Sequence, residues 1–178
     1  MKKSFVSAKA LAALAMLSAI SIVAGKYLAI SAGEFMRFSL ENLPLLFAGI
    51  AFGPFAGALV GIVADITGCL LVGYTINPIL TVGAALIGLS SGVLWKLFKT
   101  LPTWVRVALS VGVSHLVGSV IVKSAGLSWF YALPFGATLM WRLLNYVIVG
   151  AVEGVIIYAL MKNRAVLSSV SSIKDGGV

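Results

Sequence analysis

The stretch Phe52-Gly-Pro-Phe-Ala-Gly-Ala-Leu-Val-Gly-Ile-Val-Ala-Asp65 decides the fold of this chain. It carries no charge before its last residue, and its glycines recur every four residues, at Gly53, Gly57 and Gly61. Gly-Pro near its start is typical of a tight turn. A glycine every four residues in an apolar helix lets a second membrane helix approach closely. The stretch therefore predicts a closely packed helix of a membrane bundle.

The composition of the whole chain agrees with a membrane environment. Of 178 residues, 61% are apolar and 10% are charged, and the mean hydropathy is +1.11. Soluble proteins average about 45–50% apolar and about 25% charged residues, so a soluble core would not hide this much apolar surface. A spanning helix takes roughly 20 residues, so the length allows about six spans and no separate hydrolytic domain. We expect an all-α membrane protein with six transmembrane helices in one domain, residues 1–164, and a flexible cytoplasmic tail, residues 165–178.

Apolar runs and turn signals place the six helices along the chain. They are expected at residues 5–27, 40–52, 55–72, 77–98, 105–122 and 136–162. Asn77-Pro78 favours a helix start, because Asn is a good N-cap and Pro is tolerated at the first helical position. Residues 31–39 are expected to form a polar connection, and residues 124–135 a loop that carries Trp129.

The basic residues indicate the orientation of the helices. With the N- and C-termini both in the cytoplasm, the inner segments hold Lys2, Lys3, Lys9, Lys96, Lys99, Arg106, Lys162, Arg164 and Lys174. The outer segments hold Lys26, Arg37 and Lys123. The inner excess follows the positive-inside rule. The net charge of +8 is therefore interpreted as topology and contact with anionic lipid headgroups, not as nucleic-acid binding.

Most hydrogen-bonding side chains gather in the outer loops and the outer halves of the helices. At a rise of about 1.5 Å per residue, Asp65 lies roughly 10 Å and Arg142 roughly 9 Å below the outer surface. Ionisable groups inside a bilayer are costly and usually face a cavity or each other. The candidate binding residues of a pocket open to the outside are Arg37, Glu41, Asn42, Asp65, Tyr74, Asn77, Thr81, Arg142 and Asn145.

These residue types suit a ligand with a carboxylate and a flat heterocycle. Arginine binds carboxylates bidentately, and Asp65, Asn77 and Asn145 would meet donors and acceptors on a ring. Two alternatives stay open. Asp65 and Arg142 lie at matched depth and would pair with each other if no ligand uses them. Trp129 fits an interfacial aromatic belt as well as a pocket.

Two further polar residues lie deeper in the membrane. His115 is near the middle of a span, where a lone histidine is typically hydrogen-bonded between helices. Glu153 is too far from the outer surface for the pocket and is interpreted as a packing or partner contact. Without a second histidine, and with Cys69 as the one cysteine, no metal site is expected. No catalytic residue and no cofactor are expected either.

Four alanines share one face of the first helix. Ala8, Ala12, Ala15 and Ala19 are spaced so that they form a stripe of small residues. Such a stripe allows close approach of another membrane helix. It is either a docking surface for a partner or a contact with this chain's own helices.

At this point the chain resembles a known family. The run from Arg37 to Asp65, continued by Gly73-Tyr-Thr-Ile-Asn-Pro78 and by Gly83-Ala-Ala-Leu-Ile-Gly-Leu89, is similar to the substrate-binding S components of energy-coupling factor (ECF) vitamin transporters, folate-type branch. The resemblance implies six helices with cytoplasmic termini and a vitamin pocket at the outer helix ends. It also implies that the alanine face docks on a transmembrane coupling subunit, which works with two cytoplasmic ATPases, in the bacterial plasma membrane.

The sequence is therefore interpreted as a non-enzymatic, folate-binding S component of an ECF-type importer. Another small carboxylate vitamin such as pantothenate would be served by similar groups. A small intramembrane enzyme is a further alternative, but Asp65 has no second acid within two turns, and a serine-histidine mechanism would need His115 opposite a residue such as Ser90. A pore is disfavoured by the asymmetric placement of the polar residues.

Overall fold

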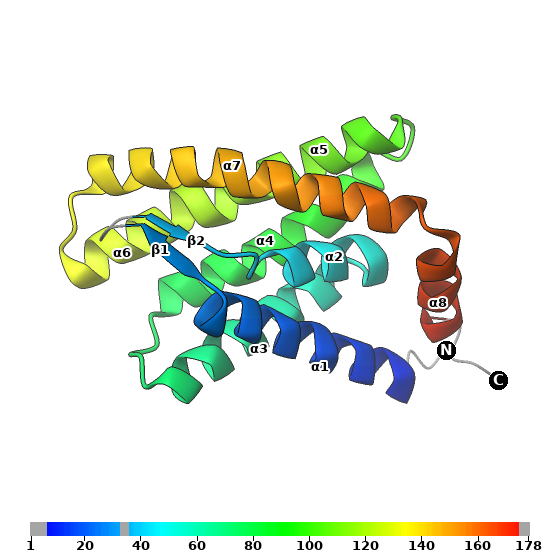
Figure 1. Ribbon diagram of the computed structural model, residues 1–178, viewed down its shortest axis with the longest axis horizontal. Coiled ribbons are helices and arrows are strands. Elements are labelled where there is room, and N and C mark those ends of the chain that lie inside the picture. Colours follow the sequence, from blue (N-terminus) through cyan, green and yellow to red (C-terminus); the bar gives the residue numbers. More distant parts are fainter. Residues whose placement is uncertain (1–6, 33–35, 175–178) are drawn as a thin grey trace.

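The computed structural model describes residues 7–32 and 36–174, and within them the fold is almost entirely helical (Figure 1). The elements are α1 (Ala8–Ile22), η1 (Val23–Tyr27), β1 (Ile30–Ala32), β2 (Met36–Phe38), α2 (Leu43–Phe52), α3 (Pro54–Val72), α4 (Pro78–Leu97), α5 (Thr103–Ser114), η2 (His115–Val122), α6 (Lys123–Tyr131), α7 (Phe135–Lys162) and α8 (Arg164–Lys174). The elements η1 and η2 are π-helical continuations of the α-helices that precede them.

Five helices of the described part are long and apolar enough to cross a membrane. They cover Ala8–Tyr27, Pro54–Val72, Pro78–Leu97, Thr103–Tyr131 and Phe135–Lys162. The prediction of an all-α membrane protein is confirmed. The sixth expected helix is present as α2, which has 10 residues and is shorter than a full span, so the number of crossings stays a prediction.

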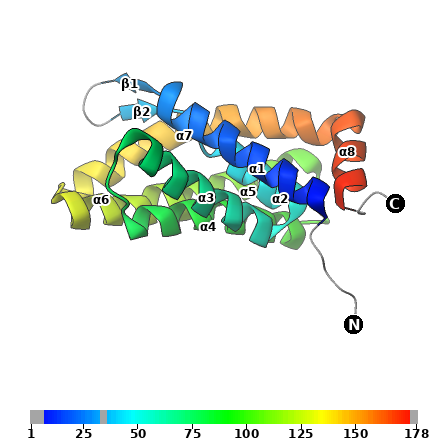
Figure 2. The same ribbon diagram turned by 90° about the horizontal axis from the view of Figure 1, so that it is seen from below.

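The two ends of the bundle differ in what they carry. Figures 1 and 2 show the hairpin β1–β2 and helix α6 at one end, the hairpin end, and α8 beside the start of α1 at the other, the terminal end. In the hairpin, Ser31 pairs with Arg37 in antiparallel register, within the stretch 31–39 expected as a polar connection. At the terminal end, Ser7 Oγ donates to the carbonyl of Ile173 at 3.0 Å. The cytoplasmic orientation of the terminal end stays a prediction.

Glycines bring α3 and α4 into backbone contact. A methyl group on Gly57 would run into the carbonyl of Gly88, and one on Gly61 into the carbonyl of Ala84. The close packing predicted from the glycine repeat is confirmed at these two positions. Gly53 acts differently, because its φ of 110° is strained for any residue with a side chain, and it separates α2 from α3.

The sequence predicts a loop at residues 124–135, and this prediction is wrong. The helix that begins at Thr103 continues through η2 into α6 as far as Tyr131. The turn follows directly, with Ala132 at a φ of 54°. Gly126 is buried where a side chain would meet Ile79 of α4, so tertiary packing outweighs the low helix propensity of this stretch.

The expected flexible tail is helical over Arg164–Lys174. Val166, Leu167 and Val170 of α8 recur at helical spacing and share an apolar hollow with side chains of α2, α4 and α7. This stripe explains why a serine-rich segment folds here, because most helical stability comes from packing an amphipathic face rather than from propensity. The terminal end of the bundle is thus covered by a helix.

Candidate ligand-binding cavity

A polar cavity of about 290 Å³ lies at the hairpin end of the bundle. Its walls come from η1, α3, α4, α6 and α7 and from the connections before α2 and before α4. Three cations, Lys26, Lys123 and Arg142, and two carboxylates, Glu41 and Asp65, line it. The lining therefore has a surplus of one positive charge, which suits an anionic ligand.

Both lysines of the cavity contact other lining groups. Lys123, 5% exposed, forms an ion pair with Glu41, its Nζ lying 3.5 Å from Oε1. Lys26 Nζ lies 3.9 Å from Cys69 Sγ and 5.4 Å from the centre of the Tyr74 ring. Because an ammonium group is expensive to bury in a membrane, such contacts are expected at a site that uses charge.

Asp65 is held by the neighbouring helix. The hydroxyl of Thr81 on α4 donates to Asp65 Oδ2 at 2.7 Å, while Thr81 itself does not line the cavity. The ion pairs of the described residues join His115 with Glu153 and Lys123 with Glu41. The alternative that Asp65 pairs with Arg142 is therefore wrong, and both line the cavity.

Arg142 is positioned by the π-helical segment η2. Its Nε donates to the carbonyl of Ser119 at 2.7 Å. In an α-helix that carbonyl would accept from the amide of Lys123, but here the Lys123 amide donates to Gly118. The π-helical register thus releases the Ser119 carbonyl for the arginine. Arg142 Nη2 also lies 3.5 Å from the hydroxyl of Tyr146.

The three predicted asparagines have different surroundings. Asn77 caps α4 as predicted, accepting from the Ile79 amide at 3.0 Å, and its Nδ2 donates to the Gly126 carbonyl at 3.1 Å. These bonds hold α4 against α6, although Asn77 also lines the cavity. Asn145 lines it too, whereas Asn42 lines an adjoining hollow of about 20 Å³ that shares Lys26 and Asp65 with the cavity.

The remaining predicted residues lie around the cavity or outside it. Tyr74 is 56% exposed at the cavity, and Trp129 is 76% exposed and absent from its lining, as an interfacial belt requires. Arg37 lies on β2 opposite Ser31. Its side chain is not among those that the structure describes. On α1, the four alanines Ala8, Ala12, Ala15 and Ala19 are exposed, so the bundle does not bury this face.

Among the lining residues that sequence reasoning did not include in the site are Lys26, Lys123 and Tyr146. The signal for the lysines was present, because both fall in predicted outer segments, where the positive-inside rule expects few basic residues. A basic residue that breaks that rule calls for another reason, such as a binding site. Tyr146 carried no such signal, because an aromatic residue in an apolar helix is usually a packing residue.

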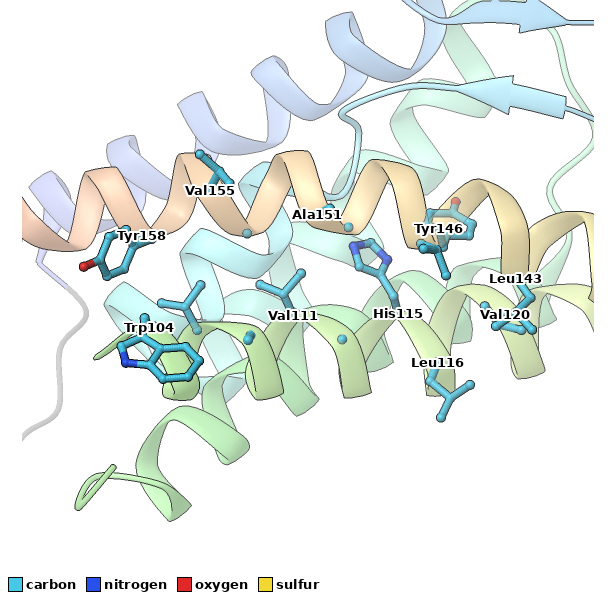
Figure 3. Close-up of a pocket in the computed structure, with 16 residues that line it drawn as sticks. Trp104, Val111, His115, Leu116, Val120, Leu143, Tyr146, Ala151, Val155 and Tyr158 are labelled. Atoms are coloured by element: carbon cyan, nitrogen blue, oxygen red, sulfur yellow. The ribbon is translucent and has the colours of Figure 1, made fainter. Parts of the chain in front are cut away.

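A second hollow, the apolar groove, lies between α5–η2 and α7 and measures about 590 Å³ (Figure 3). Trp104 and Tyr158 lie at one end, and His115 lies beside Tyr146 farther along. Tyr146 lines both the groove and the polar cavity. His115 Nε2 lies 2.5 Å from Glu153 Oε2, so the predicted hydrogen bond of this histidine between helices is confirmed.

Comparisons with known proteins agree on one family. The family model described as "ECF transporter, substrate-specific component" matches residues 9–163. The crystal structure of FolT bound with folic acid is 28% identical, with a TM-score of 0.69, covering 85% of this chain and 90% of that chain. The S component for biotin from an ECF-type ABC transporter is 20% identical, with a TM-score of 0.63, covering 86% and 90%.

A further S component, of a bacterial ECF transporter, is 21% identical, with a TM-score of 0.62, covering 87% of this chain and 94% of that chain. Like the biotin protein, it shows a shared fold. No curated protein sequence matches this chain.

Proposed function

We propose that this chain, which belongs to the family of substrate-specific components of ECF transporters, captures folate in the polar cavity. The chain is a multi-pass membrane protein and a vitamin-binding transporter subunit that works with an ECF module, and it is not an enzyme. The folate assignment goes beyond this and is supported by the chemistry of the cavity.

The charge of the lining is the observation that carries the assignment. Folate has a glutamate part with carboxylates and a pterin ring with several donors and acceptors. Arg142, Lys123 and Lys26 suit the carboxylates, since charge-assisted bonds are the strong ones in a dry site. Asp65, oriented by Thr81, suits N–H donors of the pterin. The folic acid bound to the 28% identical FolT supports the same choice.

The cavity volume favours a second candidate. About 290 Å³ lies at the lower end of the roughly 300–1,000 Å³ typical of small-molecule sites. A smaller carboxylate vitamin such as pantothenate would fit this volume directly, whereas folate requires the hairpin end to open further. The same cations would serve either ligand.

The delivery step belongs to the same proposal. The exposed alanine face of α1 docks on the transmembrane coupling subunit, and two cytoplasmic ATPases of the module drive release of the vitamin inside the cell. Helices in a membrane gain no hydrophobic driving force from lipid and associate through close packing. Small side chains suit this role because they let the helix backbones approach closely. The host membrane is the bacterial plasma membrane, with both termini in the cytoplasm.

Isothermal titration of the purified chain in detergent tests the substrate. Folate, pantothenate, riboflavin and thiamine are titrated separately into wild type and into Lys123→Met. Submicromolar binding of folate alone, weakened in Lys123→Met, is expected. Lys96→Met controls for the loss of a lysine charge away from the cavity, because Lys96 is exposed in the last turn of α4, near the terminal end. Binding of pantothenate alone selects the second candidate, and no binding of any vitamin contradicts the proposal.

A further inference from the structure

Glu153 is a buried carboxylate that the vitamin site does not use. It is 0% exposed on α7, three turns beyond Arg142, and it lines neither the polar cavity nor the apolar groove. Carboxylates inside a membrane are expensive and mark functional positions by default. Its side chain meets His115, with Oε2 lying 2.5 Å from Nε2. This contact links Glu153 to the residues around His115.

The imidazole of His115 is fixed on three sides. Nε2 faces Glu153, Nδ1 lies 3.1 Å from Ser119 Oγ, and the ring stacks on Tyr146 with centroids 4.9 Å apart and planes at 26°. Figure 3 shows the ring reaching from the start of η2 toward α7, beside Tyr146. Gly150 leaves room for it, since a methyl group there would lie 3.2 Å from His115 Cδ2.

From His115 two short routes lead into the polar cavity. The first passes through Tyr146, whose hydroxyl lies 3.4 Å from Asn42 Nδ2 and 3.5 Å from Arg142 Nη2. The second passes through Ser119, whose hydroxyl meets His115 and whose carbonyl accepts from Arg142 Nε at 2.7 Å. Both routes end on the same guanidinium group.

We propose that Glu153 and His115 form a positioning pair for the vitamin site, which rests on the proposed function of the polar cavity. The pair holds the ring of Tyr146 as the wall between the cavity and the groove, and it holds Arg142 at the angle that receives a carboxylate. Neither residue of the pair lines the cavity, so their effect on affinity is indirect. When the acceptor at Glu153 is removed, His115 loses its orientation and the wall loosens.

Substitutions at Glu153 separate a positioning role from a charge effect. Glu153→Gln keeps the shape and an acceptor for the imidazole N–H, so vitamin affinity stays within about threefold of wild type. Glu153→Leu removes the acceptor, and affinity falls about tenfold or more. Rescue by the conservative variant is the expected signature. Equal affinity of Glu153→Leu and wild type would overturn the proposal.

A milder matched pair covers the case in which Glu153→Leu does not fold. Gly150→Ala places a methyl group against the His115 ring, whereas a methyl group on Gly154, one turn along the same groove, meets nothing within 4 Å. Gly150→Ala is expected to weaken vitamin binding severalfold and Gly154→Ala to leave it unchanged. If both bind as wild type does, the positioning role is rejected.

His115 also provides a direct spectroscopic readout, because it is the chain's one histidine. With isotopically labelled histidine, saturating vitamin should shift the ring resonances of His115, and Tyr146→Leu should abolish the shift. Ring resonances that stay in place while the vitamin binds wild type would contradict the positioning pair alone. Failure of wild type to bind any vitamin would instead contradict the proposed function, and the pair with it.

Discussion

The polar cavity and the apolar groove both take lining residues from α7, and they differ in chemistry more than in position. The groove is the larger, at about 590 Å³ against about 290 Å³. Its lining is almost entirely aliphatic, glycine and aromatic, whereas the cavity collects three cations and two carboxylates. In water a large apolar hollow would be the first choice for a ligand site.

In a membrane that preference reverses. An apolar groove open to lipid is filled by acyl chains and needs no further ligand, because lipid tails are as apolar as its walls. Buried charges are expensive in the same surroundings and persist where they serve binding or pairing. The smaller, charged hollow is therefore the one expected to select a solute, and Tyr146 lines both hollows.

The largest expected effect distinguishes the alanine face of α1 from the apolar groove as the surface that binds the coupling subunit. Ala12→Trp or Ala15→Trp on α1 should abolish vitamin uptake in cells that carry the coupling module, because the bulky ring blocks close helix approach. Vitamin binding by the purified variants should be unchanged. Ala108→Trp, an exposed alanine of the groove, is the control and should leave uptake intact. The reverse pattern would make the groove the docking surface.

A second change removes the guanidinium of the cavity. Arg142→Ala should weaken the binding of carboxylate vitamins by about 3 kcal/mol, roughly a hundredfold in affinity, because a charge-assisted hydrogen bond in a dry site is lost. Arg106 is a close match at the terminal end, since its Nε donates to the Trp95 carbonyl at 2.6 Å and its guanidinium lies over that ring.

Calorimetric titration of both variants distinguishes two causes of weaker binding: the loss of a contact to the vitamin, and the loss of the arginine's bonds within the protein. Arg106→Ala should bind the vitamin as wild type does. Equal weakening by both changes would show that Arg142 supports the fold rather than the ligand.

Much of this fold follows from its apolar runs. The expected spans at 55–72 and 77–98 agree with α3 and α4 within one residue at each end, because Gly53-Pro54 and Asn77-Pro78 mark where these helices begin. The continuation of α5 through η2 to Tyr131 was not predictable in the same way. It depends on the packing of Gly126 against α4 and on a π-helical register that has no local sequence signal.

The site was predictable in location and in part of its membership. The rise per residue of a helix predicts a similar depth for Asp65 and Arg142. The structure places both of them in the lining of the same cavity. Their partners were not predictable, since Thr81 reaches Asp65 and Ser119 reaches Arg142 only through the rotation of neighbouring helices. The same holds for the contact of His115 with Glu153.

A third change compares the close contact between α3 and α4 with the open apolar groove. Gly88→Ala should destabilise the protein by about 2 kcal/mol or more, because the methyl group would run into the backbone of Gly57. Gly112→Ala lies in the groove, where nothing lies within 4 Å of the new methyl group, so higher helix propensity should leave stability equal or raised. Thermal unfolding in detergent measures both. A destabilised Gly112→Ala would mean that this part of the groove is filled by side chains of the folded protein rather than open.

The smallest expected effect concerns the hydroxyl that orients the carboxylate of the cavity. Thr81→Val keeps the shape of the side chain but removes the donor to Asp65 Oδ2, so vitamin affinity should fall by about 1 kcal/mol, roughly fivefold. Thr81→Ser restores a hydroxyl at the same position and should restore affinity, as isothermal titration can determine. If the valine variant binds as tightly as wild type, the Thr81 hydroxyl does not orient Asp65 for the ligand.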